Sequence, residues 1–189
     1  MKNIIILACA LCFTPFIWAQ QKPTDLDKSP MDMSYWPANY PILKLNGKAK
    51  DAPVARLIYS RPQKNGRVIF GGIQKYGEMW RLGANESTEI EFFNSVKIGN
   101  KTITKGRYTL YCMLNSADKW TIIVSNDNYS WGNYNYDQKK DVVRVDIKPE
   151  KNIDVIENFT MYFDSTKDGA NLVILWDDVK AVLPITSVP

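Results

Sequence analysis

Residues 56–81 concentrate cationic side chains in a short, glycine-rich stretch of the sequence. Six Lys or Arg side chains occur there with a single acid, Glu78. Guanidinium groups bind carboxylate, sulfate and phosphate oxygens through paired hydrogen bonds, and an indole ring stacks on cations and on ring faces. The composition of this stretch therefore predicts a pocket for an anionic group or a saccharide.

Local features indicate which side chains would line that pocket. Pro62 stops a strand and can direct Arg61 away from the sheet, while Gly83 allows the backbone to approach a ligand closely. In this hypothesis the arginines and an asparagine donate hydrogen bonds, tryptophans stack, and a glutamate orients an arginine. The candidate ligand-binding residues are Arg61, Arg67, Trp80, Arg81, Asn85, Glu86, Trp131 and Tyr136.

The same arginines also have a purely structural interpretation. Arg67 and Arg81 can pair with Glu86, Glu89 or Glu91 and fix a long loop on the sheet. In that case the guanidinium groups would fix the loop rather than bind a ligand. The pattern of residues leaves the structural and the ligand-binding interpretations open.

A second cluster of interest is the segment NDNYSWGNYNYD, residues 126–137, which we call the aromatic loop. It contains four aromatic and four asparagine side chains. Rings that stack on CH faces, beside amides that donate and accept hydrogen bonds, are typical of sugar recognition. A long hairpin loop that packs its own rings would have the same composition, so this alternative also stays open.

The chain contains no histidine, which removes several classes of chemistry. Ser-His-Asp and Cys-His catalysis as usually built are excluded, and so are histidine-ligated zinc, copper and non-haem iron sites. Oxygen ligands for calcium occur at residues 126–128 and at Asp177 and Asp178, but we expect these to be solvated turn residues. We therefore predict no cofactor, no metal site and no catalytic residue.

The N-terminal residues are typical of a secretory signal peptide. Lys2 precedes an apolar run that is shorter than the roughly 20 residues needed to span a membrane, and Ala19 offers a small residue for cleavage. Removal of residues 1–19 leaves Cys112 as the single cysteine, which we expect to be buried and inert. Export without disulfides predicts a location in the periplasm or at the surface of a bacterium.

These candidate residues must be positioned by strands, because the hydrophobic period is two along most of the chain. Thr88, Ile90 and Phe92 alternate with two glutamates, and Gly99 with Asn100 forms a two-residue hairpin signal. We count about nine strands at spacings that favour antiparallel pairing, which predicts an all-β, antiparallel sandwich of jelly-roll-like or barrel-like form. At most one short helix is expected, near residues 73–80.

The expected domain organisation has three parts. Residues 1–19 are the signal peptide, residues 20–53 are an irregular lead-in with five prolines, and residues 54–189 form a single β-sandwich domain. Prolines at that density disfavour helix interiors and central strands. Tyr35, Trp36 and Tyr40 are too apolar for a free tail, so part of the lead-in should pack on the domain.

Several motifs give the chain a resemblance to a known envelope family. The segments YSRPQKNGRVIFGG and YGEMWRLGANESTEIEF, followed by KGRYTLY, WGNYNYD and DVVRV, resemble the domain of unknown function 2911, common among Bacteroidota. The resemblance covers residues 52–185 and departs from the usual pattern at Leu82, where threonine is usual. It implies a secreted or periplasmic β-rich domain and no catalytic residues.

The leading functional interpretation is a non-enzymatic binding domain for a glycan fragment or an anionic group. One alternative is a saccharide-acting enzyme that uses Glu86, Glu89 or Glu91, which would need two carboxylates facing one pocket. Another is a structural or assembly protein whose lead-in, between Tyr35 and Tyr40, docks on a partner. The net charge of +4 is too small to favour nucleic acid, and no membrane span is expected.

Overall fold

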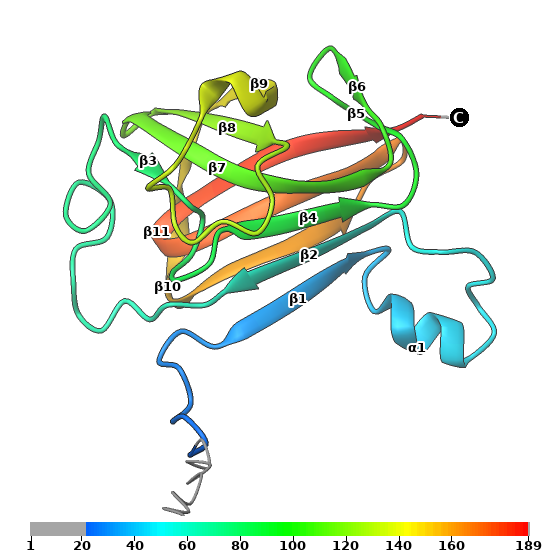
Figure 1. The fold of residues 1–189 in the computed structure, drawn as a ribbon, viewed down its shortest axis with the longest axis horizontal. Coiled ribbons are helices and arrows are strands. Elements are labelled where there is room, and N and C mark those ends of the chain that lie inside the picture. Colours follow the sequence, from blue (N-terminus) through cyan, green and yellow to red (C-terminus); the bar gives the residue numbers. More distant parts are fainter. Residues whose placement is uncertain (1–21, 189) are drawn as a thin grey trace, which may run out of the picture.

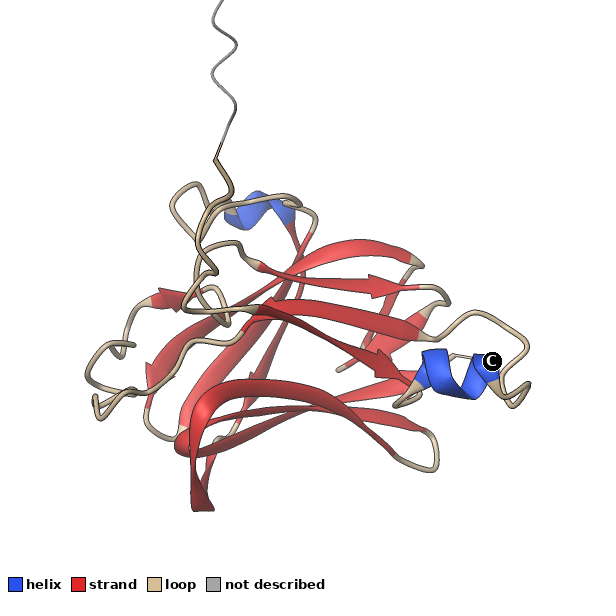
Figure 2. Ribbon diagram, turned by 90° about the horizontal axis from the view of Figure 1, so that it is seen from below, coloured by secondary structure: helices blue, strands red, loops and turns tan. Residues whose placement is uncertain are grey.

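The computed structural model describes residues 22–188, and nearly all of its regular structure is strand. Two antiparallel sheets pack face to face (Figures 1 and 2). The predicted all-β antiparallel sandwich is thus confirmed, with eleven strands where about nine were expected. The expected signal peptide lies outside the described residues. Within residues 22–188, no helix has the length and apolar character required to cross a membrane.

The first sheet carries the candidate site. Its strand order is β1-β2-β4-β7-β8-β9, and the short β3 pairs with β7. The strands are β1 (Met31–Trp36), β2 (Ala55–Ser60), β3 (Met79–Trp80), β4 (Thr88–Phe92), β7 (Gly106–Ser116), β8 (Lys119–Ser125) and β9 (Asp141–Ile147).

The second sheet is formed around one long hairpin and has the order β10-β11-β5-β6. Its strands are β5 (Val96–Ile98), β6 (Lys101–Ile103), β10 (Glu150–Ser165) and β11 (Gly169–Ser187). Gly99 and Asn100 connect β5 to β6 as the sequence predicted, and Gly99 has a φ of 59°, which the tight turn requires.

Aromatic rings fill the space between the sheets. Trp80, Trp120 and Trp176 are buried together, with Phe70 and Phe159 at their edges. The Trp80 ring centroid lies 6.2 Å from that of Trp120 and 6.0 Å from that of Trp176. Burial of such large rings is the main stabilising contribution to this core.

One edge of the sandwich is closed by side chains and a loop carbonyl rather than by strand pairing. Along β10, the N–H groups of Phe159, Met161 and Phe163 donate to Pro62 O, Tyr59 Oη and Ser34 Oγ at 2.9, 3.0 and 3.3 Å. We call this contact between β10 and the β1–β2 pair the seam. It satisfies backbone donors that would otherwise lie unpaired at a sheet edge.

The lead-in is more regular than the sequence predicted. It supplies the edge strand β1 and the helix α1 (Tyr40–Leu45), which follows β1 at one end of the sandwich (Figure 1). The prolines permit both elements because they lie outside the interiors: Pro30 precedes β1, Pro37 follows it, and Pro41 lies in the first turn of α1. The expectation of an irregular segment was therefore wrong at these residues.

The single α-helix of the described chain is not near residues 73–80, where the sequence allowed one. Residues 71–77 form turns, and β3 follows them. Gly71 and Gly77 adopt φ values of 81° and 83°, which interrupt helical backbone. Ile73 and Tyr76 are exposed, so the helical spacing of apolar residues did not correspond to a buried face.

Candidate functional site

Arg61 does not face a ligand pocket but is held inside the seam. Its Nη1 lies 3.0 Å from Oδ2 of Asp32 on β1, and its Nε donates to Phe159 O at 3.1 Å. Nη2 donates to Thr160 Oγ1 at 2.8 Å. All three nitrogens of the guanidinium thus bond to the protein itself, which corresponds to the structural interpretation.

Arg67 is also occupied by its surroundings. Its Nε donates to Lys64 O at 2.9 Å, and its Nη2 donates to Gln63 O. These bonds hold the turn at Asn65 and Gly66, which leads into Arg67. The structure therefore does not bring Arg61 and Arg67 to the aromatic loop.

Trp80 cannot stack on a ligand because it belongs to the core. Only 2% of its surface is exposed, and its Nε1 donates to Gly83 O at 3.3 Å. The sequence contained no signal that separated a buried indole from an exposed one at this position. The expectation of a stacking role for Trp80 is thus corrected by its burial.

The remaining candidates do meet, because the aromatic loop docks on the segment before β4. Ser87 N donates to Ser130 O at 3.0 Å, and Gly132 N donates to Asn85 O at 3.0 Å. Between these bonds Glu86 and Trp131 form an isolated antiparallel bridge. Asn133 Nδ2 adds a bond to Met79 O at 2.8 Å. The loop is therefore anchored, and Asn85, Glu86 and Trp131 lie at one place.

Arg81 lies beside this docked loop with its charge unmatched. A Cβ atom built on Gly132 would lie 3.7 Å from Nη1 of Arg81. The Nε atom of Arg81 is buried without a hydrogen-bond partner, and Arg81 forms no ion pair within residues 22–188. It differs in this respect from Arg61, each of whose three guanidinium nitrogens bonds to the protein.

The aromatic loop presents three rings to solvent. Tyr129, Trp131 and Tyr134 are 78%, 60% and 80% exposed. They border a cavity of about 450 Å³, which we call the loop hollow. The residues that line it are Asp127, Tyr129, Ser130, Trp131, Tyr134, Asn135 and Lys140.

Tyr136, in contrast, turns inward and supports the loop. Its hydroxyl donates to Oδ2 of Asp141 at 2.6 Å and accepts from Nη1 of Arg144 at 2.8 Å. Its ring meets that of Tyr111 edge to face, with centroids 5.3 Å apart. Burial and the bond to Asp141 raise the pKa of Tyr136 to about 12. Tyr136 is therefore a supporting residue rather than a surface for a ligand.

A second cavity of about 340 Å³ adjoins the first, and we call it the acidic hollow. Tyr129 and Ser130 line both cavities. Glu86 and Glu89 contribute carboxylates to its wall, and Ile58 contributes apolar surface. The full lining consists of Met31, Ile58, Glu86, Ser87, Glu89, Tyr129 and Ser130.

Buried polar atoms without partners gather around the aromatic loop. Within residues 22–188, four of the six such atoms belong to Arg81, Tyr111, Asn128 and Asp141. Asn128 is in the loop, Asp141 and Tyr111 contact its Tyr136, and Arg81 lies beside Gly132. Buried polar groups normally find a partner in the protein or in bound solvent, so this region has unused hydrogen-bonding capacity.

The acids of β4 are engaged in a ladder across three strands. Arg56 on β2, Glu91 on β4 and Arg107 on β7 lie directly opposite one another. Arg56 Nη2 lies 2.5 Å from Oε2 of Glu91, and Arg107 lies 3.8 Å from Glu89. Such cross-strand pairs are a usual stabilising feature of sheets. Glu86 forms no ion pair within the described chain, so it does not orient an arginine as expected.

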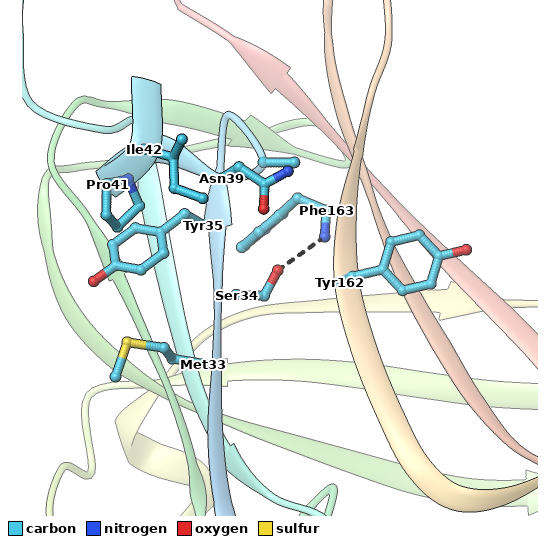
Figure 3. Close-up of a pocket in the computed structure, with 9 residues that line it drawn as sticks. Met33, Ser34, Tyr35, Asn39, Pro41, Ile42, Tyr162 and Phe163 are labelled. Atoms are coloured by element: carbon cyan, nitrogen blue, oxygen red, sulfur yellow. Dashed lines mark hydrogen bonds between the residues drawn. The ribbon is translucent and has the colours of Figure 1, made fainter. Parts of the chain in front are cut away.

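A third cavity lies between the lead-in and β10 (Figure 3). It has a volume of about 480 Å³, and Tyr35, Ile42 and Phe163 make its walls mainly apolar. The seam bond from Phe163 N to Ser34 Oγ, dashed in Figure 3, marks the point where β1 and β10 come together. We call this cavity the lead-in hollow. The sequence gave no indication of it beyond the aromatic residues of the lead-in.

Two of the carboxylates considered as calcium ligands, those of Asp127 and Asp177, are paired with lysines. Oδ1 of Asp127 lies 2.6 Å from Nζ of Lys140, and Oδ2 of Asp177 lies 3.1 Å from Nζ of Lys64. Within residues 22–188, no cluster of three or more His, Cys, Asp or Glu side chains could hold a metal ion. Cys112 is buried, and burial raises the pKa of its thiol well above the usual value.

Sequence reasoning missed Tyr129, Tyr134 and Lys140, which line the loop hollow. The two tyrosines belong to the aromatic segment that was singled out, so their ring type was already a usable signal. Lys140 had none, because it reaches the cavity from η1 (Gln138–Lys140) after the loop has folded back.

The chain was compared with family models, curated proteins and solved structures. No curated protein and no solved structure matches it. A model described as "Protein of unknown function (DUF2911)" matches residues 44–185, more than half of the chain. This range includes the basic stretch, the aromatic loop and all strands except β1 and the last two residues of β11. The chain therefore belongs to the DUF2911 family of proteins of unknown function.

Proposed function

We propose that this protein is a non-enzymatic binding domain whose ligand is a saccharide. The binding surface is the aromatic loop, and the observation that carries the proposal is the exposure of Tyr129, Trp131 and Tyr134 around one cavity. Exposed rings offer large stacking faces at a low cost in conformational entropy, because each has only two side-chain torsions. Sugar rings present CH faces that stack on such platforms.

The anchoring of the loop supports binding without a large ordering cost. The bonds Ser87 N to Ser130 O and Gly132 N to Asn85 O fix both sides of Trp131 before a ligand arrives. A binding loop that is already ordered loses little entropy when its ligand binds. The rings are therefore preorganised in their exposed positions.

Polar groups suited to sugar hydroxyls surround the rings. Asn135 lines the cavity with an amide that can donate and accept, and Lys140 with Asp127 forms an ion pair at its wall. Arg81 provides an unmatched guanidinium beside Gly132. The combination of stacking faces and convergent polar groups is the usual chemistry of a small-molecule site.

The enzymatic alternative has less support. Glu89 and Glu91 share Arg107 across the sheet, and Glu91 also pairs with Arg56. A glycosidase needs two carboxyl groups that face its substrate, whereas two of the three candidate glutamates are held in ion pairs across the sheet. A binding function requires no such pair of carboxyl groups.

The compartment is part of the proposal and rests on the sequence. We propose that residues 1–19 direct export and that the mature protein acts in the periplasm or at the cell surface. The test is N-terminal sequencing of the protein recovered from cell fractions. A mature protein that begins at Gln20 in the envelope or medium supports export, whereas an intact Met1 in the cytoplasm contradicts it.

The binding proposal is tested by tryptophan fluorescence. Trp131 is 60% exposed, and the other four tryptophans of residues 22–188 are at most 6% exposed, so a ligand on Trp131 changes the solvent-exposed part of the emission. The probes are β-1,4-linked tetramers of glucose, N-acetylglucosamine and glucosamine, with maltotetraose as a fourth. We expect a shift to shorter wavelength with at least one tetramer.

Variants of the exposed rings test whether stacking accounts for the binding of the tetramer. Trp131→Ala and Tyr134→Ala should each weaken binding of that tetramer by about fivefold in calorimetry, since an aromatic contact contributes about 1 kcal/mol. Trp131→Phe should keep most of the affinity and lose the fluorescence signal. Tyr76→Ala, an exposed ring remote from the loop in sequence, is the matched control and should bind like the wild type. No binding of any tetramer at millimolar concentration would overturn the proposal.

A further inference from the structure

We infer that the ligand is an oligosaccharide that spans both hollows and carries an amine where it lies over Glu86. This inference depends on the proposed saccharide-binding function and narrows it to a length and a charge. It is carried by the adjoining cavities and by the uneven distribution of ion pairs around them.

The two hollows adjoin along the aromatic loop. Tyr129 and Ser130 line both of them, and Ser130 O accepts from Ser87 N at 3.0 Å, so a backbone hydrogen bond fixes the segment that the two hollows share. Tyr129 is 78% exposed at this junction. A sugar ring stacked on Tyr129 would lie at the border between the hollows, so the sugar units linked to it on either side could enter both of them. This position favours a chain of sugars over a single sugar.

The loop hollow has no uncompensated ion in its wall. Lys140 and Asp127 are its charged lining residues, and their Nζ and Oδ1 atoms lie 2.6 Å apart. Such a pair bonds to hydroxyl groups but does not select a charged ligand. We therefore place neutral sugar units in this hollow, against Trp131 and Tyr134.

The acidic hollow has an excess of negative charge. Glu86 has no ion-pair partner within residues 22–188, and Glu89 has only Arg107, at 3.8 Å. Arg107 forms ion pairs with both Glu89 and Glu91, so its single charge is shared by two carboxylates. Its guanidinium carbon also lies 5.6 Å from the ring centroid of Tyr129. An ammonium group supplies three donors and a compact charge for such carboxylates. Ile58 and Met31 provide apolar contact for the CH groups of the same sugar.

The test compares three tetramers that differ only at carbon 2 of each ring. The β-1,4-linked tetramers of glucose, N-acetylglucosamine and glucosamine carry a hydroxyl, an acetamido and an ammonium group there. In calorimetry at pH 6 and low salt, we expect the glucosamine tetramer to bind about tenfold more tightly than the other two. The preference should shrink in 0.5 M NaCl, because added salt screens exposed charges.

Glu86→Gln should remove most of the preference for the amine, measured as the ratio of the affinities for the glucosamine and glucose tetramers. Glu78→Gln is the matched control, since Glu78 is also an exposed acid before β4 and lies outside both hollows. Length is tested with the glucosamine dimer, which should bind about tenfold more weakly than the tetramer. Tyr129→Ala should bring the tetramer close to the affinity of the dimer.

The possible outcomes separate this inference from the function on which it rests. If no tetramer binds, the saccharide-binding function itself fails. If the three tetramers bind equally, the function stands and the amine is wrong. If the amine is preferred but Glu86→Gln keeps the preference, the acidic hollow is not its site and the inference is overturned. Equal affinity of dimer and tetramer overturns the proposal that the ligand spans both hollows.

Discussion

Arg61 and Arg81 come from the same basic stretch of sequence, yet they have opposite environments. Each nitrogen of the Arg61 guanidinium is bonded within the seam, to Asp32, Phe159 and Thr160. The Nε of Arg81, beside the aromatic loop, is buried and has no hydrogen-bond partner among residues 22–188. The first arginine thus holds the sandwich together, whereas the second has a donor atom that no group of residues 22–188 uses.

This difference shows that local charge in a sequence does not measure charge available for binding. The partners of Arg61 lie about one hundred residues away in sequence, at Phe159 and Thr160, and reach it only because β10 runs along the β1–β2 pair. The tryptophans show the same contrast between a structural and an exposed residue, since Trp80 is in the core and Trp131 is on the surface. Substitutions at the two arginines and at the two tryptophans test both contrasts.

The largest expected effect distinguishes the two tryptophans. Trp80→Ala should lower the free energy of unfolding by about 3–5 kcal/mol, because it leaves a cavity among Trp120, Trp176 and Phe159. Trp131→Ala should change it by no more than about 0.5 kcal/mol, as for other exposed positions. Urea denaturation measures both. Equal losses would mean that Trp131 is part of the core rather than of a binding surface.

The arginines should differ in the same direction. Arg61→Met removes one ion pair and two hydrogen bonds, which should lower the free energy of unfolding by about 2–3 kcal/mol. Arg81→Met removes a buried donor that has no partner, so stability should stay within about 0.5 kcal/mol of the wild type or rise. The midpoints of urea unfolding test this, and a greater loss for Arg81 would reverse the assignment of roles.

A smaller effect should come from the acceptor that Tyr59 provides to the seam. Tyr59→Phe leaves the buried N–H of Met161 without its 3.0 Å bond, at a cost of about 1–2 kcal/mol. Hydrogen exchange of the Met161 amide should accelerate in this variant while the amides of the aromatic loop keep their wild-type rates. Faster exchange throughout the chain would show that the seam is not a local feature.

The smallest effect concerns the pH dependence of stability. Burial is the main cause of the raised pKa values of Tyr59 and Tyr136, and that of Tyr136 reaches about 12. Because the folded state favours the neutral phenols, their contribution is complete below the ordinary pKa of about 10 and is lost as the pH rises towards 12. The free energy of unfolding should therefore fall between pH 10 and pH 12. Tyr136→Phe should make that fall shallower, and an unchanged slope would contradict the inward position of Tyr136.

Patterns within single strands were sufficient to predict the fold class. The alternation in β4 buries Thr88, Ile90 and Phe92, and their positions follow from the period of two alone. The structure of the lead-in was harder to predict, because the sequence does not reveal whether the prolines at 30, 37 and 41 interrupt a strand or helix or lie at its ends. Their places beside β1 and α1 are settled by packing of Trp36 and Tyr40 on the domain.

The sequence predicted only the part of the candidate site whose residues are close together in the chain. The aromatic loop could be recognised from its composition, but its attachment depends on the backbone atoms of Asn85, Ser87, Ser130 and Gly132. Backbone bonds carry little residue signature, so the meeting of these segments could not be read from the sequence. Arg61 and Arg67 bond to backbone carbonyls, and such bonds cannot be recognised in a sequence. The sequence therefore places both arginines in a pocket, whereas the structure uses them to hold loops and strands together.

The most direct test of this account is to map the binding surface by amide chemical shifts in ¹⁵N-labelled protein titrated with the glucosamine tetramer. We expect changes at residues 81–89 and 126–140, with no change at Arg61, Arg67 or the lead-in hollow. Changes centred on Ser34, Ile42 and Phe163, or on Arg61, would contradict the assignment of the aromatic loop as the binding surface.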